Sequence, residues 1–298
     1  MMEFDERMKS DRVRKLLEKL RSAENTIVSG SELDAIRRKA ERAHRPVPIE
    51  EALRGKLLKA ERGVAWLVEG PATEVHSGVR ELEQRYLRAF EQASTSHPES
   101  TYHPEVRDCL QAGLERLLFL DIETTGIQAA MVFLVGIMRW TGDGFVIRQF
   151  FARDYPEEAA VMESVQQEGD TAGVLVTFNG KTFDLPSLHE RARYHRVDFR
   201  WRKPHCDLLH EARRQWKNIL PNCRLQTLEA AVCGTPRGAD IPGWEIPGAY
   251  HEYARTGDAR KMTAIASHNA RDLLAMADIL VSVVEGRVPD AVDWADFA

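Results

Sequence analysis

The chain has 298 residues, of which 43% are hydrophobic and 29% charged; this is typical of globular proteins and allows one large or two modest domains. The formal net charge of -5 excludes a globally basic surface, so a nucleic acid would have to be held by local basic patches or by bound metal. No apolar run approaches the ~18 residues of a membrane span, and the first residues do not resemble a signal peptide. Four scattered cysteines without a CxxC pair favour free thiols in a reducing cytoplasm.

Residues 1–105 are predicted to form a mostly helical N-terminal extension. The segment 11–20 has apolar residues at helical spacing, and 31–43 resembles a second helix capped by Ser31. Residues 63–70 fit a short strand, and 78–93 fit another helix. The polar segment 94–104 contains two prolines and is the expected junction. The second predicted domain is 106–298.

The second domain is predicted to be α/β. Three strand candidates, at 117–123, 131–140 and 145–152, are joined by short links, which indicates an antiparallel meander. A helix at 156–167 follows, and then a short, fully apolar strand at 174–178, as expected of a buried central strand. Helices dominate from Leu185 onward, apart from a possible fifth strand near 197–205. This order predicts a layered α/β plan.

Two acids, Asp121 and Glu123, end the first apolar run in the sequence DIETTG. Residues i and i+2 of a strand point to the same face, so carboxylates at this spacing can converge on one cation, although acids are also common at strand ends. Asp184 follows the strand at 174–178, where loops from adjacent strand ends form the usual crevice of an α/β sheet. It could also serve as the cap of the next helix.

Asp272 and His268 lie four residues apart in a strongly periodic helix and therefore share one face. His268 could instead be exposed to water or form a local ion pair with Asp272. Four clustered acids repel one another without cations, and Mg²⁺ and Mn²⁺ prefer oxygen ligands. Two such ions can clamp the attacking water and the leaving oxygen of a phosphodiester. The candidate catalytic and metal-binding acids are therefore Asp121, Glu123, Asp184 and Asp272.

Several ordered segments resemble a known family. DIETTG (121–126), NGKTFDLPSL (179–188) and HNARD (268–272) are similar to the three motifs of the DEDD exonuclease superfamily. CRLQTLE (223–229), RGADIPGWEIPGAY (237–250) and DLLHEARRQWK (207–217) add a closer resemblance to YprB-like ribonuclease H-like proteins. The resemblance covers roughly 115–284. It implies a five-stranded mixed ribonuclease H-like sheet flanked by helices, two Mg²⁺ or Mn²⁺ ions, and phosphodiester hydrolysis.

The resemblance also implies a role for each residue. Asp121 would bridge both metals, Glu123 and Asp272 would hold one of them, and Asp184 would hold the other, directly or through water. His268 would position or deprotonate the attacking water, as a histidine can do. The common exonuclease types carry a Tyr four residues before the last Asp or a His five before it. This chain has a His at the spacing of the Tyr, so its side chain would approach the water from a different angle.

The densest basic region of the core spans 191–217, where basic and aromatic residues alternate. Arginine pairs bidentately with phosphate and aromatic rings stack on unpaired bases, which favours a contact with DNA or RNA. The expected form of the nucleic acid is a single strand or an end. Alternatively, the basic region is only a solvated helix face with buried aromatic residues. The candidate substrate-binding residues are Thr124, Asn179, Lys181, Arg200, Arg202 and Arg213.

The sequence thus predicts a cytoplasmic, metal-dependent nuclease acting on DNA or RNA, as a 3′–5′ exonuclease. The main alternative is a ribonuclease H-like module that binds nucleic acid without cleaving it. A hydrolase of small phosphate esters is a second rival. No membrane partner is expected, and residues 1–105 are expected to pack onto the core.

Overall fold

The computed structural model describes residues 45–96, 102–126, 130–234, 238 and 240–289. Contacts divide the chain into two units, Met1–Pro46 and Val47–Ala298. The helices predicted at 11–20 and 31–43 lie outside the described residues. The domain boundary after residue 105 stays a prediction, but residues 47–96 belong to the same unit as the residues that follow. None of the described helices is long and apolar enough to cross a membrane.

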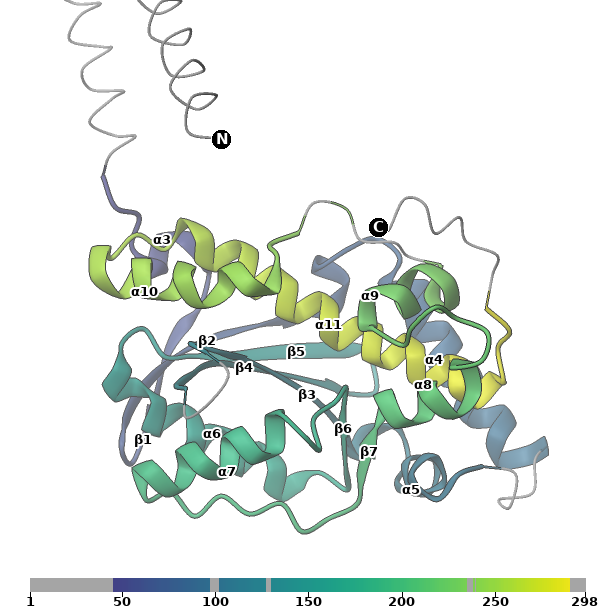
Figure 1. Ribbon diagram of the computed structural model, residues 1–298. Coiled ribbons are helices and arrows are strands. Elements are labelled where there is room, and N and C mark those ends of the chain that lie inside the picture. The colour runs from purple at the N-terminus through teal and green to yellow at the C-terminus, as the bar shows by residue number, and fades with distance from the viewer. Residues whose placement is uncertain (1–44, 97–101, 127–129, 235–237, 239, 290–298) are drawn as a thin grey trace, which may run out of the picture. The chain divides into compact units, whose positions relative to one another are not determined.

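A seven-stranded mixed sheet lies at the centre of the second unit, in the order β1-β2-β5-β4-β3-β6-β7 (Figure 1). β3, β4 and β5 form the predicted antiparallel meander, and β6 and β7 run parallel to β3. The strands are β1 (Lys56–Ala60), β2 (Gly63–Pro71), β3 (Leu117–Thr124), β4 (Val132–Trp140), β5 (Phe145–Phe151), β6 (Val174–Thr177) and β7 (His205–Asp207). The α/β fold is therefore confirmed.

The predicted number of five strands is wrong, because β1 and β2 form a hairpin that pairs with β5. The hairpin covers the edge at which the meander would otherwise leave unpaired backbone groups. β2 matches the strand predicted at 63–70, but β1 contains only exposed and half-buried residues. An edge strand buries few side chains, so its sequence lacks an apolar run. The last strand, β7, is also shorter and later than the one expected near 197–205.

Helices cover both faces of the sheet (Figure 1). On one face the sheet shares an apolar core with α4, α5, α8 and the second half of α11, and on the other with α6, α7, α10 and the start of α11. The helices are α3 (Ile49–Ala52), α4 (Val79–Ser96), α5 (Pro104–Ala112), α6 (Glu158–Thr171), α7 (Asp184–His195), α8 (Leu208–Trp216), α9 (Leu225–Leu228), α10 (Ile246–Thr256) and α11 (Arg260–Glu285). Short 3-10 turns lie at Ala72–Glu74, Leu114–Arg116, Tyr155–Glu157 and Gly243–Glu245, and a π turn lies at Glu229–Cys233.

Two apolar cores on opposite sides of the sheet explain the unbroken hydrophobic run of β3. Leu117 and Phe119 enter the core beneath α11 and α8, whereas Leu118 and Leu120 enter the core beneath α6 and α7. A strand buried on both faces reads as a continuous apolar segment. Asp121 and Glu123 continue the alternation of Leu117 and Phe119, so they point to the face that α11 covers. The four cysteines are free thiols.

Candidate active site

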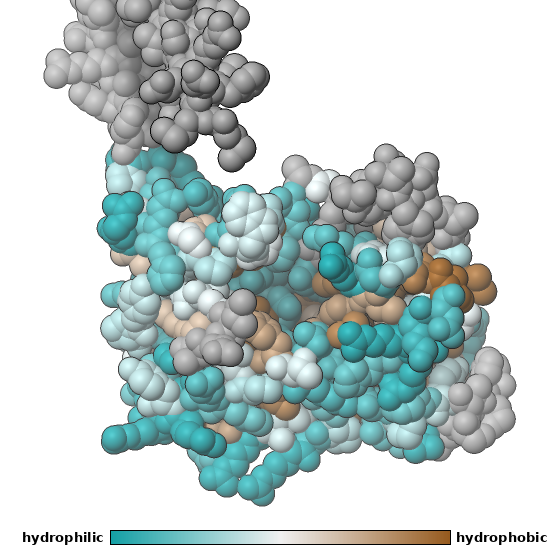
Figure 2. Space-filling view, in the orientation of Figure 1, coloured by the Kyte–Doolittle hydropathy of each residue, from teal (hydrophilic) through white to brown (hydrophobic). Residues whose placement is uncertain are grey.

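The predicted acids come together where β3 and β6 end and α11 crosses the sheet. β3 and β6 run parallel, with Phe119 opposite Val176, so the residues that follow them reach the same edge of the sheet. Asp121 and Glu123 lie on β3, and Asp184 is the first residue of α7. Helix α11 contacts β3 and carries Asp272. The face shown in Figure 2 is mostly hydrophilic and is hollowed near its centre.

Asp121 is the centre of the acid cluster. Burial raises the pKa of its carboxyl well above the usual range, and the negative charges of Asp272, Glu123 and Asp184 raise it further. A hydrogen bond from Asn269 acts in the opposite direction. The four carboxylates are therefore close enough to repel one another, which is the situation of metal-binding acids in the absence of cations.

Asp184 has a similar environment and is only 4% exposed. Burial raises its pKa to about 7, helped by the charges of Asp207 and Asp272, while backbone N–H groups of Asp184 itself and of Ile122 donate hydrogen bonds that lower it. The bond from Ile122 joins the start of α7 to β3. The N-cap of α7 is Phe183, so Asp184 does not have the capping role that its sequence position also allowed.

His268 lies between two carboxylates and is 9% exposed, so it is not the water-exposed residue that was the alternative. Its Nδ1 lies 2.8 Å from Oδ2 of Asp240, and its Nε2 lies 3.7 Å from Oδ2 of Asp272. Asp240 thus contacts one ring nitrogen, and Nε2 faces Asp272 in the i,i+4 arrangement of the local ion pair that the sequence also allowed. The imidazole therefore directs Nε2 to the acid cluster.

Asp240 was not predicted as a site residue. It precedes α10 in the chain and lies 28 residues before His268, which it nevertheless contacts. The pairing depends on how the segment before α10 folds against α11, which cannot be predicted from the spacing of residues along the chain. The only signal in the sequence was its position in the stretch 237–250, which supported the resemblance to YprB-like proteins.

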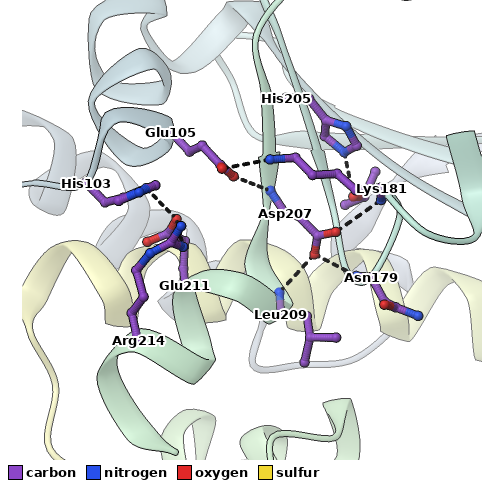
Figure 3. Close-up of polar contacts among 10 residues, drawn as sticks. His103, Glu105, Asn179, Lys181, His205, Asp207, Leu209, Glu211 and Arg214 are labelled. Carbon is purple, nitrogen blue, oxygen red and sulfur yellow. Dashed lines mark hydrogen bonds and ion pairs between the residues drawn. The ribbon is translucent and has the colours of Figure 1, made fainter.

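A further buried carboxylate, Asp207, holds the loop that leads from β6 to Asp184 (Figure 3). Its oxygens accept hydrogen bonds from the backbone N–H groups of Asn179, Lys181 and Leu209, at 2.8, 3.0 and 3.1 Å. Asn179 has a φ of 65°, a left-handed conformation that asparagine adopts more readily than most residues. The contacts of Asn179 thus shape the turn that leads to Asp184.

Lys181, another predicted substrate contact, lies with its Nζ 2.7 Å from Oε1 of Glu105. Glu105, His103 and Glu211 offer ligand atoms that all lie within 4.8 Å of one another. Lys181 neutralises Glu105, however, and Nη1 of Arg214 lies 2.7 Å from Oε1 of Glu211 (Figure 3). We interpret this group as an ion-pair network that holds α5 and α8 against the loop, separate from the acid cluster.

Two predicted arginines, Arg200 and Arg202, are not brought to the acids. They precede β7, in a segment whose Pro204 carbonyl accepts a hydrogen bond from Leu175 at the start of β6. Asp121 and Glu123 lie in the carboxyl-terminal half of β3, and Asp184 follows the carboxyl end of β6. Four to six residues of strand at ~3.3 Å each place roughly 13–20 Å between the two edges. Arg213 lies on α8 and is exposed.

Other residues of the basic region 191–217 have structural contacts. Nζ of Lys203 donates to the carbonyl oxygens of residues 169, 170 and 172, where α6 ends. Arg191 pairs with the buried Glu158, and Trp216 is buried, with its indole N–H bonded to the carbonyl of Arg287. The alternative of a helix face with buried aromatics therefore describes much of this region. Thr124 is also mostly buried, and its hydroxyl donates to the carbonyl of Gly126.

Comparison with known families gives a match over most of this region. A family model described as RNase_H superfamily matches residues 118–284. The chain belongs to the RNase H superfamily. It is 32% identical over 174 residues to the protein YprB of Bacillus subtilis (strain 168), so the predicted resemblance to YprB-like proteins is confirmed. The match covers 55% of this chain and 41% of YprB, so the chain spans about two fifths of that relative.

Two solved structures are similar to parts of this RNase H superfamily chain. One is the family B DNA polymerase from the hyperthermophilic archaeon Pyrobaculum calidifontis, with a TM-score of 0.45, 18% identity, and coverage of 54% of this chain and 23% of the polymerase. The other is the zinc-bound form of the ExoI–ssDNA complex of E. coli, with a TM-score of 0.34, 17% identity, and coverage of 51% of this chain and 41% of ExoI.

Proposed function

We propose that the protein is a metal-dependent nuclease that hydrolyses phosphodiester bonds of DNA or RNA with two Mg²⁺ or Mn²⁺ ions, as a 3′–5′ exonuclease. One observation carries the proposal: four acids from β3, α7 and α11 meet beside the parallel strands β3 and β6, close enough for burial and the three neighbouring charges to raise the pKa of Asp121. Such mutual repulsion destabilises the protein unless cations neutralise it. Carboxylate oxygens are the ligands that Mg²⁺ and Mn²⁺ prefer, so the residues present fit these ions.

The four acids would hold the ions, directly or through water: Asp121, Glu123, Asp184 and Asp272. Bound there, divalent cations stabilise charge on the phosphate and lower the pKa of a bound water. His268 would take the proton of the attacking water on Nε2, because Asp240 holds Nδ1 at 2.8 Å. Helix α11 carries both His268 and Asp272, so the base and one metal ligand are fixed in one rigid element.

Nucleic acid is the proposed substrate class because the chain belongs to the RNase H superfamily, and exposed cationic and aromatic side chains support it. Arg213 is exposed on α8, and Tyr194 is 70% exposed on α7, about 15 Å along the helix from Asp184. Arginine pairs with phosphate, and an exposed aromatic ring can stack on an unpaired base. A single strand or an end is the proposed form of substrate.

The test is Mn²⁺-dependent cleavage of labelled single-stranded, duplex and hybrid substrates, comparing the unchanged protein with Asp121→Asn. We expect the substitution to reduce cleavage at least ~10³-fold, since the cations contribute several kcal/mol to the transition state. Circular dichroism should remain unchanged. The matched control is Asp198→Asn, an acid whose side chain is 76% exposed and outside the cluster.

Each other outcome has a defined meaning. Undiminished cleavage by Asp121→Asn would overturn the assignment of the site. If the unchanged protein binds nucleic acid but cleaves none of the substrates with Mn²⁺ or Mg²⁺, the chain is a binding module instead. Cleavage of nucleotides alone would support a hydrolase of small phosphate esters.

A further inference from the structure

Three residues lie side by side across the sheet next to the acid cluster. Asp121 of β3 is paired with Gly136 of β4, and Gly136 is paired with Gln149 of β5. Residues in such register share one face of the sheet. Since Gly136 has no side chain, an open position separates Asp121 from Gln149 on that face.

Asn269 of α11 fills this position and is fully buried. A Cβ atom added to Gly136 would lie 1.9 Å from Oδ1 of Asn269. Only glycine therefore leaves room for the amide between the two neighbouring side chains. Glycine is required at this position because a side chain would not fit. Its backbone conformation is that of an ordinary strand residue and would allow other residues.

Hydrogen bonds fix the direction in which the Asn269 amide points. Nε2 of Gln149 donates to the carbonyl oxygen of Ala266 at 2.7 Å and to Oδ1 of Asn269 at 2.8 Å. A carbonyl oxygen only accepts, so the NH₂ group of Gln149 must face α11 and the oxygen of Asn269 must face Gln149. Nδ2 of Asn269 is then directed to Asp121, where it donates to Oδ2 at 2.7 Å.

We infer that Asn269 and Gln149 are positioning residues for the metal site: they hold Asp121 in one orientation through a buried chain of two amides. This inference rests on the proposed function. The amide occupies Oδ2 of Asp121 and leaves Oδ1 as the oxygen without this donor. A hydrogen bond from a neighbouring group orients a ligating carboxylate and commonly contributes 10- to 100-fold to metal affinity.

The chain of amides also connects two elements that carry metal ligands. Asn269 follows His268 and precedes Asp272 by three residues on α11, whereas Asp121 and Glu123 lie on β3. A contact between Asn269 and Asp121 thus sets how far the helix acid lies from the strand acids. The fully buried amide is preorganised before any cation binds, because its partners are strand and helix groups of the same core.

The test is the affinity for Mn²⁺, measured by isothermal titration calorimetry, and it needs no cleavage assay. Asn269→Leu keeps the volume of the side chain and removes its hydrogen bonds, so we expect Mn²⁺ affinity to fall about 10- to 100-fold. Gln149→Leu should weaken binding less. In a protein that already carries Asn269→Leu, Gln149→Leu should cause no further loss of Mn²⁺ affinity, because Gln149 acts on Asp121 through Asn269. Ser282→Ala, another buried polar residue of α11, is the control and should leave Mn²⁺ affinity unchanged.

A purely structural role of Asn269 would lower the melting temperature in EDTA but leave the Mn²⁺ affinity of the folded protein unchanged, and that result would overturn the inference. Should Asn269→Leu fail to fold, Gly136→Ala displaces the amide without removing a polar group and should give the same loss of affinity. Combining Gly136→Ala with Asn269→Ala should relieve the steric clash and leave the affinity low. If the unchanged protein binds no Mn²⁺, the proposed function is overturned and the inference with it. If Mn²⁺ affinity is unchanged in both Asn269→Leu and Gly136→Ala, the inference alone is overturned.

Discussion

Asp184 and Asp207 are two buried aspartates, 4% and 0% exposed, that follow or end neighbouring parallel strands, yet their surroundings differ. Asp207 accepts hydrogen bonds from three backbone N–H groups. Asp184 accepts hydrogen bonds from the backbone N–H groups of Ile122 and of Asp184 itself, but burial and the charges of Asp207 and Asp272 outweigh them and raise its pKa to about 7. A buried charge with enough donors holds the fold together, whereas one that faces other charges opposes folding. The difference separates the acid that shapes the loop from the acid that can bind a cation.

The largest expected effect is on cleavage, when Asp184 is replaced. Asp184→Asn should reduce Mn²⁺-dependent cleavage by ~10³-fold or more, because it removes a proposed metal ligand. In EDTA the same variant should be at least as stable as the unchanged protein, since it removes a repelled charge. Thermal unfolding and a cleavage assay on the same samples check both parts. A loss of stability together with a loss of cleavage would mean that Asp184 supports the fold instead.

The sign of the pH dependence follows from the raised pKa of Asp184. Its carboxyl binds a proton more strongly in the folded than in the unfolded chain, where the pKa is ordinary. Its contribution to stability is therefore fully present at low pH and is lost as the pH rises towards 7. In EDTA, unfolding between pH 5 and pH 8 should show a smaller decline of stability in Asp184→Asn than in the unchanged protein. An identical decline in both would contradict this account.

Asp207→Asn should show the opposite pattern: the free energy of unfolding should fall, and the direct effect on cleavage should be the smaller one. Asparagine keeps one acceptor oxygen in place of two, so at least one backbone N–H of the loop at 179–181 or of α8 would lose its partner. We expect about 1–3 kcal/mol of lost stability, the usual penalty for an unsatisfied buried group. Urea unfolding in EDTA measures it. A variant as stable as the unchanged protein would show that the loop does not depend on this carboxylate.

The dyad of His268 and Asp240 predicts an intermediate effect on cleavage. Asp240→Asn leaves a side chain that can still contact Nδ1 at 2.8 Å but no longer requires the proton to be on that nitrogen. We expect cleavage to fall about 10- to 100-fold, as for other groups that orient a functional histidine. Mn²⁺ affinity should change little, which separates this effect from loss of a ligand. Asp240→Asn with full activity would remove the role proposed for His268 as the base.

Much of the arrangement of the candidate site could be predicted from the sequence because its signals are local. The spacing of Asp121 and Glu123 fixes a shared face of a strand, and the spacing of His268 and Asp272 fixes a shared face of a helix. The apolar runs before Asp121 and Asp184 predicted the strands whose parallel pairing brings the acids together. The antiparallel meander was likewise encoded by short links between strands.

What the sequence did not reveal depends on contacts between distant segments. Asp240 acquires its role only from the fold of the segment before α10, and Asn269 only from an open position at Gly136 on another element. β1 was missed because an edge strand buries few residues. In the basic region, Lys203 binds the end of α6 and Arg191 binds Glu158, and neither partner is close in the sequence.

The smallest expected effect concerns Arg202, which is exposed before β7, at the amino ends of the parallel strands. The acids lie at the other ends, roughly 13–20 Å away along the strands, which exceeds the ~8 Å over which exposed charges act at physiological salt. Arg202→Ala should therefore change the cleavage of a short oligonucleotide less than ~3-fold at 0.15 M salt. Arg213→Ala, on α8 beyond the carboxyl end of β7, is the comparison and should raise KM more. A tenfold rise in KM for Arg202→Ala alone would show that the nucleic acid crosses the sheet to its amino-terminal edge.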